Sequence, residues 1–107
     1  MWIFTTKGFL SIAQHNDLPE HFQVKSRVSS PLQELWPDHE IEVIDWADYR
    51  FRITVEKKEV FPVMTQLLES VDYSNFKHEC HGMKEYHSAL MGVWTEMHNY
   101  QARMESD

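Results

Sequence analysis

Cysteine and glycine are both scarce in this sequence. Cys80 is the only cysteine among 107 residues, so no disulfide can form within the chain, and a reducing compartment is the expected environment. We therefore expect the protein to be cytoplasmic. The glycines Gly8, Gly82 and Gly92 are too widely scattered to build a phosphate-binding loop. A disulfide scaffold and a glycine-rich nucleotide loop are thereby excluded.

Long apolar runs and an excess of positive charge are also missing. No stretch has enough consecutive apolar residues to cross a membrane, and residues 1–8 lack the basic start and apolar run of a signal peptide. The formal net charge is −7, from 10 basic and 17 acidic residues. Nucleic-acid binding depends on Lys and Arg that neutralise phosphates, so this balance argues against direct contact with DNA or RNA. Residues 1–58 hold seven of the basic residues, so any basic surface is expected there.

Familiar catalytic motifs are missing as well. The chain has no Gly-x-Ser-x-Gly elbow and no His-Glu-x-x-His metalloprotease motif. The run His-Glu-Cys-His at 78–81 resembles the deaminase His-x-Glu only loosely, because no Pro-Cys-x-x-Cys accompanies it. No motif therefore supports an enzyme, and a role without catalysis is favoured.

The composition is that of a folded domain. Hydrophobic residues make up 42% of the chain and aromatic residues 13%, values typical of a globular protein rather than a disordered tail. A chain of this length can bury a core without metals or disulfides. We predict a single α+β domain over residues 1–107.

Alternating apolar and polar residues predict the strands. Lys7-Gly8 separates two short apolar segments and indicates a tight hairpin. The cleanest alternation is in 49–56, where the expected inward side carries Tyr49, Phe51, Ile53 and Val55. Five strands are expected, at residues 2–5, 9–14, 21–28, 40–45 and 49–56.

Helices are predicted between and after these strands. Ser29-Ser30-Pro31 is a start signal for a short helix to Trp36. A second helix has an apolar face expected to cover the sheet, formed by Val60, Val63, Met64, Leu67, Leu68 and Val71. A third, of about six turns, carries Met83, Tyr86, Leu90, Val93, Met97, Tyr100 and Met104. The predicted order is β-β-β-α-β-β-α-α, a single antiparallel sheet with the two C-terminal helices packed on one face.

Four basic side chains are expected on the polar side of this sheet. If the apolar sides of both alternating strands are buried, the face away from the helices carries Lys25, Arg27, Arg50 and Arg52. Such a set could clamp a phosphate or a carboxylate. The alternative, which has the greater weight from the sequence, is a solvated cross-strand ladder in which Glu40 and Glu42 pair with these cations.

Histidines gather in the C-terminal half. His78, Cys80 and His81 lack a fourth ligand and a known metal-binding spacing, so no metal site is predicted. On the long helix, His87 and His98 share a flank with Met91 and Trp94. A histidine there could act as a general base, although such a flank is more often packing.

Several of these segments together resemble a widespread family of small bacterial proteins without an assigned activity. The resemblance rests on the opening Met1-Trp2-Ile3-Phe4-Thr5, on Gly8-Phe9 with Ser11, on Asp48-Tyr49-Arg50-Phe51-Arg52, on Asp72-Tyr73-Ser74-Asn75-Phe76-Lys77, and on Tyr86-His87 with Trp94. This chain has Arg50 where the family has Pro. The resemblance implies a single domain and no reaction. It directs attention to the polar positions that match the family pattern, Arg27, Arg52, Asn75, Lys77 and His87.

Three functions follow as hypotheses. The first is a non-catalytic module without cofactor or metal that binds an anionic small molecule, in one version a nucleotide-sequestering protein, and forms a homodimer. Its expected ligand-binding residues are Lys25, Arg27, Arg50, Arg52, Asn75, Lys77 and His87. The second is a protein–protein inhibitor or adaptor with an acidic surface. The third is a phosphoester hydrolase that uses His87 or His98 as the base.

Overall fold

The computed structural model describes residues 1–106. The chain forms two compact units, residues 1–72 and the residues from 73 onward. The first unit contains the whole sheet, and the second is helical. The α+β class is therefore confirmed, whereas the single domain over residues 1–107 stays a prediction.

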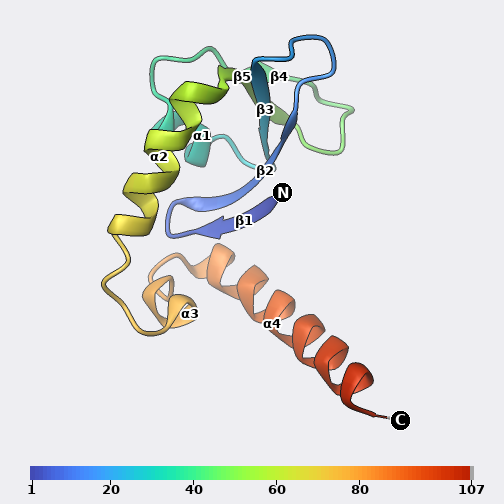
Figure 1. Cartoon of the computed structure of the whole chain (residues 1–107). Coiled ribbons are helices and arrows are strands. Elements are labelled where there is room, and N and C mark those ends of the chain that lie inside the picture. Colours follow the sequence, from blue (N-terminus) through green and yellow to red (C-terminus); the bar gives the residue numbers. More distant parts are fainter. Residues whose placement is uncertain (107) are drawn as a thin grey trace. The chain divides into compact units, whose positions relative to one another are not determined.

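The sheet has five strands in the order β1-β2-β3-β5-β4, and every neighbouring pair is antiparallel (Figure 1). The strands are β1 (Trp2–Thr5), β2 (Gly8–Gln14), β3 (His21–Ser26), β4 (Glu42–Val43) and β5 (Phe51–Glu56). All five predicted strands are present. The order places β5 beside β3 and leaves the short β4 at the edge.

Three of the strands are shorter than the alternation predicts. β3 ends at Ser26, and β5 begins only at Phe51. Arg27, Tyr49 and Arg50 thus lie outside the strands, where a period of two no longer determines the side on which a residue lies. Leu10 belongs to the core, so its neighbour Phe9 in β2 points to the opposite side of the sheet. The ring centroid of Tyr49 is 6.3 Å from that of Phe9, so Tyr49 lies on that opposite side and does not continue the inward side of β5.

A tight turn joins β1 and β2, as expected. Gly8 has φ of 138°, a conformation that glycine adopts without strain. The Thr5 hydroxyl accepts from the backbone N–H groups of Lys7 and Gly8 at 3.0 and 3.1 Å and donates to the Gly8 carbonyl at 2.8 Å. A Cβ at position 8 would collide with the ring of Pro31. The turn therefore needs glycine for its backbone and for its close packing.

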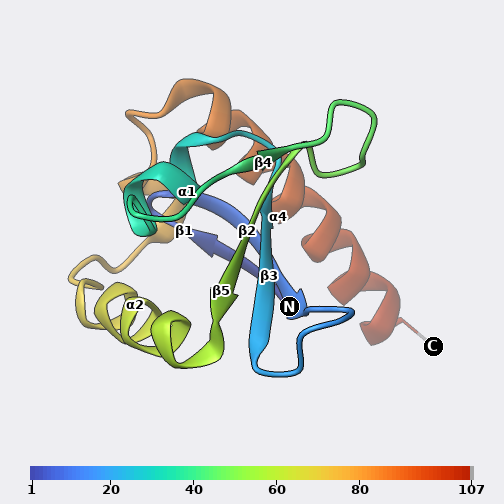
Figure 2. The same ribbon diagram turned by 90° about the horizontal axis from the view of Figure 1, so that it is seen from above.

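One face of the sheet is covered by two helices, α1 (Ser30–Leu35) and α2 (Lys57–Glu69), which lie on the same side in Figures 1 and 2. α1 has Pro31 in its first turn, in agreement with the start signal in the sequence. The buried core between the helices and the sheet consists of Leu10, Ile12, Val24, Leu32, Trp36, Ile53, Val55 and Val60. We call the opposite side of the sheet the outer face.

The apolar stripe of α2 contributes less to this core than its spacing predicts. Val60 is buried, and Val63 and Met64 pack partly against the core, but Leu68 is 76% exposed. The residues of α2 that contact the core, Val60, Val63 and Met64, lie in its first eight positions, because the helix begins at Lys57. Pro62 is consequently the sixth helical residue, and its missing N–H interrupts the helical hydrogen-bond ladder.

The second unit contains α3 (Phe76–Glu79) and α4 (Lys84–Glu105). α3 begins at Phe76 because the Asn75 side chain caps the helix, accepting from the His78 N–H at 3.0 Å. The long helix is confirmed as α4. Across residues 1–106, no helix is long and apolar enough to cross a membrane.

Candidate functional site

Two of the four predicted cations are direct neighbours in the sheet. Lys25 of β3 is paired with Arg52 of β5, and Arg52 is paired in turn with Glu42 of β4. Their chain neighbours Val24 and Ile53 belong to the core, so Lys25 and Arg52 lie on the outer face, as the alternation predicts. We call Lys25 and Arg52 the basic row.

The basic row is half-buried, and its charges have few partners. The Nη2 atom of Arg52 donates to the Tyr49 carbonyl at 3.0 Å, but its Nε atom is buried without a hydrogen-bond partner. Within residues 1–106, the side chain of Lys25 forms no hydrogen bond or ion pair, and Arg52 forms no ion pair. Glu42 is in register with Arg52, but the predicted salt-bridge ladder is not formed.

Arg52 borders an open depression of about 410 Å³ beside the edge strand β4. Its lining combines the guanidinium group with acidic and hydroxyl side chains, from Glu40, Glu42, Arg52, Ile53 and Thr54. A space of this composition offers hydrogen-bond donors and acceptors to a polar molecule. It lacks the predominantly apolar lining that is usual in drug-like ligand pockets.

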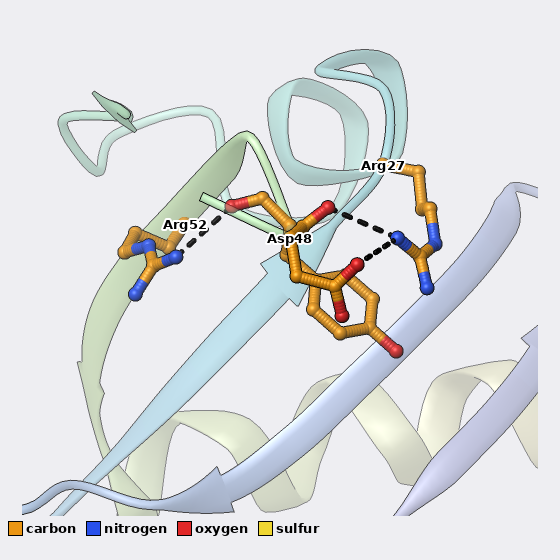
Figure 3. A network of polar contacts seen from close by, with 4 residues as sticks. Arg27, Asp48 and Arg52 are labelled. Carbon is orange, nitrogen blue, oxygen red and sulfur yellow. Dashed lines mark hydrogen bonds and ion pairs between the residues drawn. The ribbon is translucent and has the colours of Figure 1, made fainter. Parts of the chain in front are cut away.

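Arg27, by contrast, is held by the loop before β5. Its Nη1 atom donates to the Asp48 carbonyl at 3.0 Å and to Asp48 Oδ1 at 2.9 Å (Figure 3). Its guanidinium carbon lies 4.2 Å from the centre of the Tyr49 ring. The hydrogen bond with the Asp48 carboxylate is the main cause that raises the pKa of Arg27. The strand register makes Lys25, and not Arg27, the direct neighbour of Arg52.

Arg50 is also paired. Its Nε atom donates to Asp45 Oδ1 at 2.8 Å, and its guanidinium carbon lies 5.4 Å from the centre of the Phe51 ring. Asp45 and Asp48 thus anchor both ends of the 45–49 loop, which carries Trp46 at 88% exposure. We call this segment the braced loop. The two Arg–Asp pairs were not predicted, although two aspartates three residues apart, with an arginine two residues after the second, were a usable signal.

The remaining predicted ligand residues belong to the second unit. The Asn75 side chain caps α3, and the Lys77 ammonium lies 4.4 Å from the centre of the Trp94 ring. His87 lies in the first turn of α4. The structure therefore places Lys25, Arg27, Arg50 and Arg52 in one unit and Asn75, Lys77 and His87 in the other.

The histidines and the cysteine show local packing. The rings of His78 and His81 are stacked at 5.0 Å, and those of Trp94 and His98 at 5.2 Å with an angle of 3°. Among residues 1–106, no three His, Cys, Asp or Glu side chains gather as a metal site. Cys80 is buried, and this burial, followed by the charge of Glu79, raises the pKa of its thiol.

Comparison with known proteins adds no assignment. No protein-family model, no curated protein and no solved structure matches this chain. The resemblance of its opening residues and of segment 72–77 to a bacterial family therefore stays a prediction.

Proposed function

We propose that this protein is a non-catalytic module that binds an anionic small molecule at the basic row. The observation that carries the proposal is the direct cross-strand pairing of Lys25 with Arg52, without an ion-pair partner for either within residues 1–106. Arg27 and Arg50 were also predicted to bind the ligand, but each forms an ion pair with an aspartate of the braced loop.

Lys25 and Arg52 carry like charges directly opposite each other across β3 and β5. Like charges directly opposite each other in a sheet destabilise it, and partial burial strengthens the repulsion because less water screens it. An anion that contacts both side chains would remove this cost and would also give the buried Nε atom of Arg52 an acceptor. Binding of the anion would therefore stabilise the folded sheet.

The lining of the depression suggests the class of ligand. Glu40 and Glu42 would repel a simple polyanion but accept hydrogen bonds from amino groups. The best fit is a molecule with an anionic group and hydrogen-bond donors, and nucleotides with an exocyclic amine belong to this class. Sequestration of a nucleotide in the cytoplasm remains one concrete role.

Calorimetry with a panel of nucleotides and with inorganic phosphate tests the proposal. We expect wild type to bind one nucleotide, and Arg52→Ala to weaken binding about tenfold or more, since a charge-assisted contact is worth about 1.5–3 kcal/mol. Arg50→Ala is the matched control, because Arg50 is exposed and already paired with Asp45. Its affinity should equal that of wild type.

A second variant separates a ligand site from a structural role. Lys25→Gln should raise the stability of the unliganded protein, because it removes the repulsion, and should abolish the stabilisation by the ligand. If Lys25→Gln and Arg52→Ala both lower stability while binding is unchanged, or if wild type binds nothing at millimolar concentration, the basic row is structural and the proposal fails.

A second candidate function is a protein-binding module centred on the braced loop. Exposed tryptophan is costly to hydrate and is enriched at the centres of interfaces, and Trp46 is held by a loop that two Arg–Asp pairs make rigid. A stoichiometric partner recovered from native cells should then be lost with Trp46→Ala and weakened with Arg27→Ala. Equal recovery by wild type and Trp46→Ala would remove this function.

The hydrolase hypothesis receives no support from the site. His98 is stacked on Trp94, which agrees with the packing interpretation of that flank. In the described part of the chain, the His87 side chain forms no hydrogen bond or ion pair that would orient it as a base.

A further inference from the structure

The C-terminal half of α4 carries an exposed apolar stripe. Met97 is 57% exposed, Tyr100 51% and Met104 69%. These residues continue a seven-residue repeat with apolar side chains at alternating spacings of three and four, namely Met83, Tyr86, Leu90, Val93, Met97, Tyr100 and Met104. This spacing is the core pattern of a two-stranded coiled coil.

The exposure of this half of α4 indicates that a partner molecule packs on the stripe. From Trp94 to Glu105, every residue of α4 is exposed. An isolated helical segment of this length is marginal in water, since most helical stability comes from packing of an apolar face. A partner on this face would supply the missing stabilisation.

We infer that this partner is the same helix of a second copy, packed antiparallel to the first. In an antiparallel pair, the first apolar position of one heptad lies against the second apolar position of the other helix. With Met97 opposite Tyr100 of the second copy, the two-fold symmetry repeats the same layer. Val93 then lies opposite Met104 of the second copy, so each exposed apolar residue has an apolar partner.

Charge complementarity selects this register. Glu96 and Arg103 occupy equivalent positions, seven residues apart, on the same flank of the stripe. In an antiparallel pair, this flank of one helix faces the same flank of the other. Glu96 therefore lies beside Arg103 of the second copy, and the two-fold symmetry forms this pair twice. A parallel pair would instead place Glu96 opposite Gln101. Within residues 1–106, neither Glu96 nor Arg103 forms an ion pair, so both are available.

The expected dimer is weak. The two helices overlap over about two heptads, so the interface is smaller than the about 1,200 Å² of a stable complex and belongs to the transient class. The inference does not depend on the proposed anion site, because α4 belongs to the second unit.

Sedimentation velocity from micromolar to submillimolar concentration tests the inference with the whole chain. Wild type should shift from monomer to dimer as concentration rises. Met97→Glu should stay monomeric, because it places a carboxylate in the central layer, with unchanged circular dichroism since the residue is exposed. Thr95→Glu is the matched control on the opposite side of α4 and should dimerise like wild type.

Charge exchange tests the register. Glu96→Arg and Arg103→Glu should each raise the dissociation constant about tenfold, because each replaces two attractions by two repulsions. The double variant should recover the wild-type constant. A monomeric wild type at all concentrations overturns the inference, as does dimerisation that Met97→Glu leaves intact. A double variant that fails to recover overturns the antiparallel register.

Discussion

At the residue scale, the function of each arginine depends on its neighbours rather than its type. Arg27 and Arg50 each face an aspartate within hydrogen-bond distance, whereas Arg52 faces a lysine across the strands and a carbonyl. The paired arginines are largely exposed, so each ion pair adds little stability, about 1 kcal/mol or less. Their effect is to position a loop.

Gly8 occupies a position that does not tolerate a larger residue. Gly8→Ala should destabilise the protein by about 2–4 kcal/mol, because its φ of 138° is strained for alanine and the new methyl group would overlap Pro31. Urea unfolding measures the loss. Gly92→Ala is the control, since nothing lies within 4 Å of its added Cβ and the helix should gain about 0.5–1 kcal/mol. Equal effects of the two changes would contradict this account of the turn.

Cys80 should make stability fall at alkaline pH. Burial raises the folded-state pKa of its thiol above the ordinary value of 9.0, so the unfolded state loses this proton first. The contribution is therefore constant below that pH and is lost as pH rises through the folded pKa, by up to about 1.4 kcal/mol per pH unit. Cys80→Ala should show a shallower loss in urea unfolding from about pH 8 to about pH 10. Identical slopes would argue against a protected thiol.

At the element scale, α2 is held to the sheet mainly through its first half. Val60→Ala should cost about 2 kcal/mol or more, because a side chain that is 2% exposed loses two methyl groups and leaves a cavity. Leu68→Ala, at 76% exposure in the same helix, should change stability by less than about 0.5 kcal/mol. Thermal unfolding compares them, and a larger loss for Leu68→Ala would mean that the end of α2 has a partner.

The braced loop shows how an element without regular structure acquires order. Two exposed ion pairs and the contact of Arg27 with the Tyr49 ring restrain a short segment between β4 and β5. Contacts of this kind limit the freedom of the loop without requiring burial. If Trp46 contacts a partner, as proposed above, a restrained backbone lowers the entropy cost of ordering the loop on binding.

At the scale of the whole molecule, the net charge of −7 should prevent binding to nucleic acid. The cations are few, and two of the arginines are neutralised by aspartates. Fluorescence anisotropy with a labelled DNA duplex at low salt should show no binding at micromolar protein, since non-specific affinity depends on released counterions. Binding that weakens steeply with added salt would reveal a basic surface that this charge distribution does not account for.

The sequence by itself determined the class and most of the elements. Period-two alternation located the strands, and a seven-residue apolar repeat located α4, because both patterns are set by local backbone geometry. Pro31 after Ser30 marked the start of α1 for the same reason. The outward side of Lys25 and Arg52 also followed from alternation within their strands.

Strand order and the ends of the strands were decided only by tertiary structure. Placing β5 beside β3 put Arg52 opposite Lys25, a contact between residues 27 positions apart that no local pattern contains. β3 ends before Arg27, and β5 begins after Arg50, so neither arginine is held in the sheet. Arg27 pairs with Asp48, and Arg50 pairs with Asp45. The four cations were equivalent in the sequence pattern, because alternation indicates only the face of the sheet on which a side chain lies. Their partners depend on which strands meet and where each strand stops.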